Sequence, residues 1–281
     1  MDKWYQIGPF NFRIKFESDI CIPDHFSQFQ VTDHSKTDYT YYFQVVDKLP
    51  QPEGKIIADR KDLKVYGNQL MESRQIGMKG LETSYALYRE ISDQVAEISL
   101  FRNAIERINC DPVFSALFAL ERRMQQYNSL ILHCAYLVYN QKAILFSAPS
   151  GIGKSTQAAL WERYRGAYTV NGDRALLRKI EGQWNACGWP VCGSSGICKI
   201  SDTPIRAIVM LKQGKKNSIK PLSPVQAFTL LFEQITINKW NRNFVQNVIG
   251  CIEDLVKYVS VYQLTCDISE EAVVCLEKEI S

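Results

Sequence analysis

The chain has 281 residues, of which 46% are hydrophobic and 22% are charged, and its formal net charge at pH 7 is +3. This length suits one large or two modest domains, and the composition is that of a globular protein. The small net charge argues against nucleic acid or a membrane surface as the main partner. No segment approaches the run of about 20 apolar residues that a membrane helix needs, and no secretory signal begins the chain. We therefore expect a cytoplasmic protein.

Nine cysteines are scattered along the chain without a CxxC pair. Because their number is odd and no secretory signal precedes them, we expect reduced thiols. Cys187, Cys192 and Cys198 lie close together, but their spacing fits no common structural zinc pattern, and the chain has only three histidines. The sequence therefore favours small buried thiols at these positions over a metal site.

Residues 1–110 are predicted to be mostly β-structure. Apolar and polar residues alternate from Phe10 to Phe16, which is the period of a half-buried strand. Tyr39, Tyr41 and Tyr42 favour a packed sheet face over an aromatic binding strip. The spacing of the short strands favours one antiparallel sheet or a small barrel. The further segments typical of strands are residues 39–46, 55–58, 63–66, 85–89 and 95–100.

A domain boundary is predicted just before Asp111. Asp111 as N-cap and Pro112 at the first helical position begin a helix that should end near Asn128. The chain then divides into a β-rich N-terminal domain, residues 1–110, and a C-terminal domain, residues 111–281. In the second domain we expect strands at residues 130–139, 143–146, 168–170, 175–180, 183–186, 205–211 and 259–265.

Helices are predicted between and after these strands. One begins at Lys154, and another begins after Ser223 with the capping-box residue Gln226. This second helix is expected to turn Val225, Phe228 and Phe232 inward. Two further helices are predicted at residues 244–259 and 269–280 from apolar residues at helical spacing.

The strongest motif is the stretch AILFSAPSGIGKSTQAALWERY, residues 143–164. It reads as a buried strand, a loop of small residues and an amphipathic helix. Loop amides and a helix N-terminus direct N–H donors and partial positive charge at one place, which suits a polyphosphate. Gly151 and Gly153 let the backbone approach it, Lys154 would reach the β- and γ-phosphate oxygens, and the Ser155 hydroxyl would bind Mg²⁺.

Ser150, Ile152 and Thr156 complete the predicted nucleotide-binding residues. The strict motif G-x-x-x-x-G-K-[ST] requires glycine at position 148, where this chain has Ala148. The alternative interpretation is a glycine-rich turn before an ordinary helix. The strand–loop–helix context favours phosphate binding.

Asp173 is the predicted acid of the site, because it follows the strand at residues 168–170 and comes soon after the glycine-rich loop. An acid at a strand end near such a loop suits Mg²⁺ coordination or activation of a hydroxyl. The alternative is an aspartate in an ordinary turn. Residues 188–196, GWPVCGSSG, are either a mobile flap over the phosphates or a long connection.

The C-terminal half resembles the kinase domain of HPr kinase/phosphorylase and its wider group. That group includes related enzymes that phosphorylate ribosomal peptides, and it shares a P-loop type with phosphoenolpyruvate carboxykinase. Three matches carry the resemblance. Leu132-His133 resembles the family's His-Gly strand, residues 150–155 (SGIGKS) resemble the loop core, and Gly172-Asp173-Arg174 stands where the family has Asp-Asp-Arg. The resemblance implies that Asp173 is the acid near Mg²⁺ and the attacking hydroxyl, with His133 beside it.

The chain departs from this family at three places. Ala148-Pro149 stands where HPr kinase has Gly-Asp, and Gly172 replaces one of the paired acids. CGWPVCGSSG stands where the family has a run rich in Arg-Gly-Leu-Gly-Ile, which argues against HPr itself as the substrate.

The sequence thus predicts an α/β protein, α+β overall, with a mixed-sheet P-loop domain of the HPr-kinase/carboxykinase type and a smaller β-rich domain that presents the substrate. The expected function is an ATP- or GTP-dependent serine kinase acting on a protein or a ribosomally made peptide. Lys154, His133 and Asp173 would be catalytic, and Ser155 with Asp173 would hold Mg²⁺.

Two alternatives are kept: a nucleotide-binding regulatory module with little turnover, and a small-molecule kinase or carboxykinase-like enzyme. A GTPase switch is disfavoured, because residues 238–241 (NKWN) lack the terminal aspartate of a guanine-reading N-K-x-D motif. The acceptor, the nucleobase and homo-oligomerisation are left open.

Overall fold

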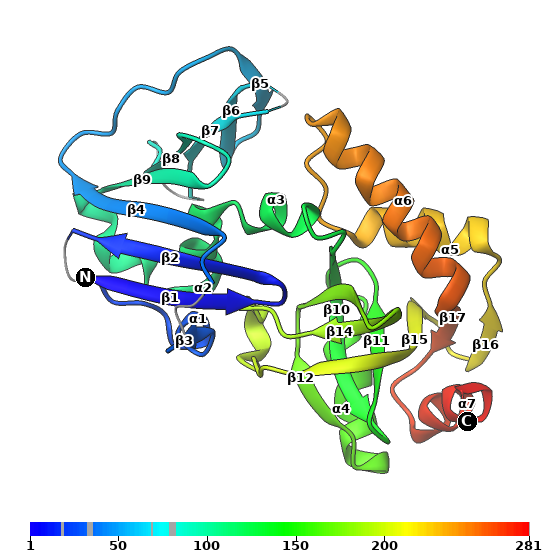
Figure 1. The fold of residues 1–281 in the computed structure, drawn as a ribbon. Coiled ribbons are helices and arrows are strands. Elements are labelled where there is room, and N and C mark those ends of the chain that lie inside the picture. The colour runs from blue at the N-terminus through cyan, green and yellow to red at the C-terminus, as the bar shows by residue number, and fades with distance from the viewer. Residues whose placement is uncertain (18–19, 33–35, 69, 79–82, 281) are drawn as a thin grey trace. The chain divides into compact units, whose positions relative to one another are not determined.

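The computed structural model describes residues 1–17, 20–32, 36–68, 70–78 and 83–280. The chain is of mixed α/β class, as predicted, and it forms two compact units, each built on its own sheet (Figure 1). The first unit comprises Met1–Arg123 with Asn238–Asn243, and the second comprises Met124–Ile237 with Phe244–Ser281. The first unit thus continues beyond residue 110, where the sequence predicts a boundary. None of the described helices has the length and apolar character that crossing a membrane requires.

The first unit is built on a nine-stranded sheet with the order β3-β1-β2-β4-β9-β8-β7-β6-β5. Its strands are β1 (Asp2–Ile7), β2 (Phe10–Phe16), β3 (Gln30–Val31), β4 (Tyr39–Val46), β5 (Ile56–Asp59), β6 (Leu63–Gly67), β7 (Glu72–Ile76), β8 (Ala86–Glu90) and β9 (Val95–Phe101). Its helices are α1 (Asp24–Ser27), η1 (Arg102–Ile108), α2 (Asp111–Ser115), η2 (Ala116–Phe118) and α3 (Leu120–Gln125), the last of which runs into the second unit.

Alternation of apolar and polar residues correctly predicts β2, whose residues alternate between buried and half-buried. The pairing of the strands differs from the prediction, because β4 pairs in parallel with both β2 and β9. The expectation of an antiparallel sheet or small barrel is therefore wrong for the centre of this sheet. Period-two alternation reports which face is buried, and it carries no information about the partner strand or its direction.

The predicted continuous helix over residues 111–128 is also wrong. Cys110 rather than Asp111 is the N-cap, and the helix breaks at Ala119, whose φ is 47°. The break lies next to Phe118, whose carbonyl accepts a buried hydrogen bond of 2.9 Å from the Tyr41 hydroxyl. Burial of the aromatic side chains against the sheet thus overrides the helical propensity of the segment.

A buried charge cluster joins α3 to β7 and β8. Its members are Glu72, Arg74, Glu90, Glu121, Arg122 and Arg123. Glu90 accepts from Arg122 Nε at 2.7 Å and also pairs with Arg123, and Arg74 donates to Glu121 at 2.6 Å. Asn238 and Trp240 of the inserted segment donate to acidic members of the cluster at 3.0 and 3.1 Å. Each acid in this interior therefore has a cationic partner.

The second unit contains an eight-stranded sheet, in which β11 pairs antiparallel with β10 and parallel with β15. Its strands are β10 (Leu130–Tyr139), β11 (Lys142–Ser147), β12 (Tyr168–Asn171), β13 (Arg174–Ile180), β14 (Gln183–Cys187), β15 (Asp202–Gln213), β16 (Ser218–Pro221) and β17 (Ser260–Cys266). Its helices are α4 (Lys154–Arg165), η3 (Gly193–Ser195), α5 (Pro224–Gln234), α6 (Arg242–Tyr258, beginning in the inserted segment) and α7 (Glu270–Ile280).

Helices cover both faces of this sheet, which explains why β10 is apolar along most of its length. Alternate residues such as Leu132 and Tyr136 pack in the core with α5 and α6. The intervening residues Ala135 and Leu137 pack in a second core with α4 and α7. A strand that is buried on both faces has a run of apolar residues, without the alternation of apolar and polar residues that a half-buried strand shows.

Helix α5 begins with the predicted capping box of Ser223 and Gln226, but its inward face differs from the prediction. Ala227 and Leu231 are buried, whereas Val225 is 77% exposed. At 3.6 residues per turn, Val225 lies about 200° around the helix from Ala227, and thus faces solvent. Phe228 and Phe232 flank the buried line and are partly buried.

Candidate functional site

The glycine loop, residues 148–153, connects the buried strand β11 to helix α4 as the sequence predicts. Gly151 and Gly153 have φ angles of 82° and 112°, which side chains rarely tolerate. A Cβ atom added to either glycine would meet nothing within 4 Å. The two glycines are therefore required by the course of the backbone, and the space beside them is open to a ligand.

The N-terminus of α4 has the features of an anion site. Its N-cap residue is Gly153 in the left-handed conformation, with no side-chain hydrogen bond to the first helical amides. The first turn of a helix has N–H groups without intrahelical partners and carries partial positive charge. A ligand with phosphate oxygens could satisfy these donors.

Lys154 lies over the loop and is only 8% exposed. Its Nζ donates to the carbonyl oxygens of Ala148 at 3.0 Å and Pro149 at 3.4 Å. Burial lowers the pKa of Lys154, while the negative charge of Asp173 acts in the opposite direction. The ammonium group is thus held at the loop, in the electrostatic field of the predicted acid.

Asp173 follows β12 and has cationic or polar groups on both carboxylate oxygens. His133 Nε2 lies 3.5 Å from Oδ1, and Arg174 Nε lies 3.2 Å from Oδ2. The pKa of Asp173 is lowered, first by the hydrogen bond from His133 and then, against the effect of burial, by the charges of Arg174 and Lys154. The structure therefore brings His133, Lys154 and Asp173 into one electrostatic cluster, with the carboxyl group ionised near neutral pH.

Two further hydrogen bonds hold this cluster to the strands. Ser147 Oγ, at the end of β11, donates to the His133 carbonyl at 2.8 Å. The Cys134 amide donates to the Asp173 carbonyl at 3.0 Å. These two bonds fix the positions of β11, β10 and Asp173 relative to one another.

The turn Cys192–Gly196 packs directly against the acid. A Cβ on Gly193 would lie 3.1 Å from Asp173 Oδ1, and a Cβ on Gly172 would lie 2.1 Å from Ser195 Oγ. Position 172 thus has no room for a side chain, which is the physical reason that a second acid cannot stand there. The sequence predicts either a flap or a connection for this segment. Nothing in its composition indicates that it contacts Asp173.

A pocket of about 530 Å³ lies beside the glycine loop. It is formed where the parallel strands β11, β15 and β17 end, and the carboxyl edge of such strands is a common place for ligands. Sequence reasoning missed the residues after β15 and β17, although the predicted ends of those strands could have indicated them. The lining residues are Gly151, Ile152, Gly153, Thr156, Gln157, Gln213, Gly214, Lys215, Cys266, Asp267 and Ile268.

Gln157, which lines this pocket, is a buried polar residue. Its side chain is 3% exposed, and Nε2 donates to the Asp267 carbonyl at 2.7 Å. Its Oε1 atom has no hydrogen-bond partner among the described residues. Buried acceptors are normally satisfied, so a water or a ligand that donates a hydrogen bond could complete this site.

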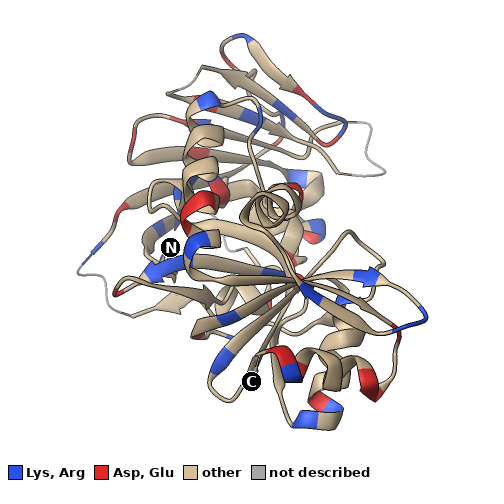
Figure 2. Cartoon of the chain, turned by 90° about the vertical axis from the view of Figure 1, so that its right-hand side faces the viewer, with Lys and Arg blue, Asp and Glu red and all other residues tan. Residues whose placement is uncertain are grey.

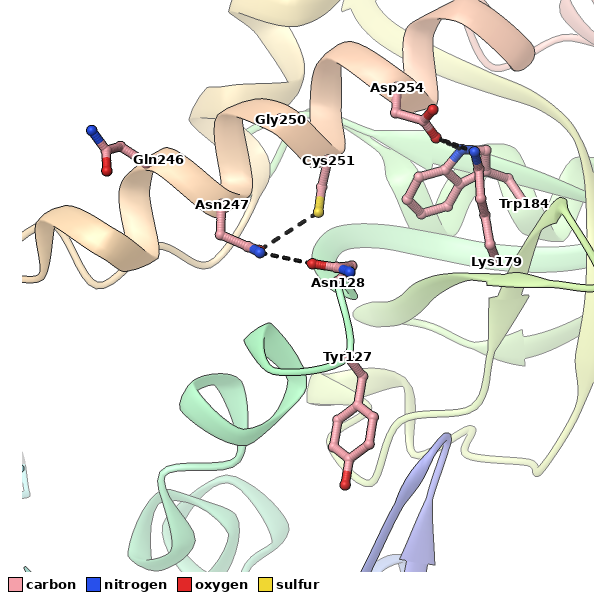
Figure 3. Close-up of a pocket in the computed structure, with 9 residues that line it drawn as sticks. All are labelled: Tyr127, Asn128, Lys179, Trp184, Gln246, Asn247, Gly250, Cys251 and Asp254. Atoms are coloured by element: carbon pink, nitrogen blue, oxygen red, sulfur yellow. Dashed lines mark hydrogen bonds and ion pairs between the residues drawn. The ribbon is translucent and has the colours of Figure 1, made fainter. Parts of the chain in front are cut away.

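A second pocket, of about 480 Å³, lies between α6 and the β13–β14 hairpin (Figure 3). Its charged groups neutralise one another, because Asp254 Oδ2 accepts from Trp184 Nε1 at 3.0 Å and pairs with Lys179 Nζ at 2.5 Å. Asn247 Nδ2 also donates to Asn128 Oδ1 across the pocket at 2.8 Å. These charged and amide groups thus have partners within the protein, which makes the pocket a weaker ligand site than the one at the glycine loop.

Two other features agree with the composition. Basic and acidic residues are interspersed along the elements of both units (Figure 2), as expected for a net charge of +3. Cys187, Cys192 and Cys198 are buried, as predicted.

In a comparison with protein families, residues 101–280 match the family described as SynChlorMet cassette protein ScmC. No curated protein matches the chain. Among solved structures, the chain is similar to the Hpr(Ser) kinase/phosphatase from Coxiella burnetii, at 13% sequence identity and a TM-score of 0.31. That similarity covers 53% of this chain and 86% of the other. At this TM-score and identity, nothing about the activity of this chain follows from it.

Proposed function

The chain belongs to the SynChlorMet cassette protein ScmC family, and we propose that it is an ATP- or GTP-dependent kinase that phosphorylates a Ser-type hydroxyl of a protein or peptide. The observation that carries this proposal is the placement of Asp173. Its ionised carboxylate lies in one cluster with His133 and Lys154, at the loop that leads into α4. Nucleotide binding alone would require only the glycine loop and Lys154. An acceptor-only group beside them also suits the orientation of a hydroxyl nucleophile.

The glycine loop is proposed to bind the phosphates of the nucleotide. The open space at Gly151 and Gly153 admits phosphate oxygens close to the backbone, and the first amides of α4 donate to them. Lys154 can exchange its two loop carbonyls for phosphate oxygens, which are stronger acceptors. The remaining residues of this proposed site are Ser150, Ile152, Ser155 and Thr156.

The pocket of about 530 Å³ is proposed to hold the nucleoside. Its volume is in the usual range for small-molecule sites, and it shares Gly151, Gly153 and Thr156 with the proposed phosphate site. The buried Oε1 of Gln157 offers an acceptor to a base amino group or a ribose hydroxyl. Both adenine and guanine nucleosides carry such donors, so ATP and GTP are both retained.

Oxygen ligands suit Mg²⁺, and the Ser155 hydroxyl with the Asp173 carboxylate would be the protein ligands. When bound, Mg²⁺ would neutralise charge on the phosphates during transfer. Asp173 would also orient the acceptor hydroxyl and accept its proton. His133, whose Nε2 lies at Oδ1 of Asp173, would hold the carboxylate in place. The first unit is proposed to present the acceptor to this site.

A nucleotide-binding regulatory module is the second candidate, because one observation favours it. Position 172 cannot hold a second acid beside Ser195, so metal binding and hydroxyl orientation both fall on Asp173. A low rate of transfer would follow. Release of phosphate from Mg-ATP or Mg-GTP, measured with and without the peptides and proteins encoded beside this gene, separates a kinase from such a module.

Lys154→Ala is expected to weaken nucleotide binding about ten- to a hundredfold. The reason is the loss of a charge-assisted hydrogen bond to the phosphates, worth about 1.5–3 kcal/mol. Calorimetric titration with Mg-ATP and Mg-GTP measures the change. Lys142→Ala is the matched control, because Lys142 lies at the start of β11, at the far end of that strand from the loop. Absence of binding by the wild-type protein at millimolar nucleotide would refute the proposed function.

A further inference from the structure

Asn171, the last residue of β12, is completely buried and makes four hydrogen bonds. Its Oδ1 accepts from the backbone amides of Asp173 and Arg174, both at 2.9 Å. Its Nδ2 donates to the carbonyls of Trp189 at 2.8 Å and Val191 at 3.1 Å. Only one orientation of the amide fits these partners, because the opposite one would point N–H groups at N–H groups.

The Oδ1 and Nδ2 atoms of Asn171 hold different parts of the chain. The Oδ1 side closes an Asx-turn around Gly172, and this turn sets the direction in which the Asp173 side chain leaves the backbone. The Nδ2 side holds the segment that leads into the turn Cys192–Gly196. The chain that follows this turn has backbone anchors of its own, since the Lys199 amide donates to the Val170 carbonyl at 2.9 Å and Asn171 forms a bridge with Cys198.

From this geometry we infer that Asn171 is a positioning residue for phosphoryl transfer, acting through the turn that aims Asp173 at the loop. The inference rests on the proposed function of Asp173. Loss of the Oδ1 acceptor leaves the Asp173 and Arg174 amides without this partner and loosens the turn before the acid, although the bond from the Cys134 amide to the Asp173 carbonyl remains. A misplacement of about 1 Å at a reacting group can lower a rate about a hundredfold.

Comparison of Asn171→Ser with Asn171→Ala tests this inference. A serine hydroxyl can still accept from the amide two residues on, whereas neither variant can donate to both loop carbonyls. We expect kcat for phosphate release from the Mg-nucleotide to fall about a hundredfold in Asn171→Ala and less than tenfold in Asn171→Ser. Nucleotide affinity should change by less than about threefold in both, because neither variant alters the glycine loop.

Amide hydrogen exchange over residues 171–176 provides a readout that does not depend on turnover. The Asp173 and Arg174 amides should exchange faster in Asn171→Ala and stay protected in Asn171→Ser. Asn185→Ala is the matched control, since Asn185 is a buried asparagine of β14 that donates to the Gln183 carbonyl at 2.8 Å. It should leave both kcat and this exchange unchanged.

Each outcome is decisive. Equal kcat values and equal exchange in the serine and alanine variants would mean that Asn171 only anchors the loop, and would overturn the inference. Wild-type rates in Asn171→Ala would overturn it as well. If the wild-type protein binds nucleotide but releases and transfers no phosphate, the proposed function fails. The exchange data then still show whether Asn171 holds the Asp173 turn.

Discussion

Asp173→Asn is expected to abolish phosphoryl transfer while leaving nucleotide affinity within about tenfold of the wild-type value. A serine hydroxyl is a weak nucleophile at pH 7, and a carboxylate within hydrogen-bond reach is needed to orient it and take its proton. Asparagine keeps the shape of the side chain but removes the charge and replaces one acceptor by a donor. The loop amides and Lys154, which bind the phosphates, are unchanged by this substitution.

Mass-spectrometric detection of added phosphate on the acceptor measures transfer, and calorimetry on the same variant measures binding. Asp202→Asn is the matched control, because Asp202 also pairs with an arginine, Arg178, but lies at the start of β15. Transfer near the wild-type rate in Asp173→Asn would contradict the proposed mechanism. Loss of both binding and transfer would show instead that Asp173 is required to hold the nucleotide.

Glu90→Gln is expected to lower the free energy of unfolding of the first unit by about 3–5 kcal/mol. The Glu90 carboxylate is buried and accepts from Arg122, Arg123 and Tyr88. An amide of the same size leaves two buried guanidinium groups without their shared counter-charge. Breaking a buried ion pair by removing one partner is costly for that reason.

The pH dependence of this loss follows from the same contacts. Burial alone would raise the pKa of Glu90, but the hydrogen bond from Arg122 and the charge of Arg123 lower it below its ordinary value. A carboxyl group with a lowered pKa in the folded state stabilises the protein fully above the unfolded pKa of about 4.3, and this contribution disappears as the pH falls through the folded value. Wild type and Glu90→Gln should therefore differ most at pH 5–7 and converge in acid.

Amide exchange of β8 peptides in increasing urea follows the unfolding of the first unit specifically. Glu97→Gln serves as the control, since Glu97 pairs with Arg89 on the same sheet but is 37% exposed. Such a surface pair contributes about 1 kcal/mol or less. Equal losses in the two variants would show that the buried charge cluster has no special part in holding this unit.

Local chemistry in the sequence determined most elements of the second unit. Asn140-Gln141 predicts the turn between β10 and β11, and both residues have the positive φ angles, 49° and 58°, of a tight hairpin. The glycine loop, the start of α4 and the capping box of α5 are likewise fixed by residues within a few positions of one another. These features depend on backbone preferences and on short-range hydrogen bonds, so a single sequence carries them.

The surroundings of the site were only partly contained in the sequence. Resemblance to a kinase family implies that His133 lies beside Asp173. In the structure, His133 Nε2 lies 3.5 Å from Asp173 Oδ1. Taken alone, a histidine in an apolar strand indicates nothing more than a core position. The pocket at the ends of β15 and β17, with Gln157 and Asp267, arises from strands that are far apart along the chain.

Tertiary structure alone decided the pairing of strands, the break in the helix and the packing on the acid. The parallel pairing of β4 with β2 and β9 and the contact of Gly193 with Asp173 join residues that are distant in sequence. The left-handed conformation of Ala119 lies next to such a contact, between Tyr41 and Phe118. Their stability comes from burial and from hydrogen bonds such as that between Tyr41 and Phe118, which exist only after the segments meet. Periodicity and propensity describe one segment at a time, and so they determined the elements but could not determine these contacts.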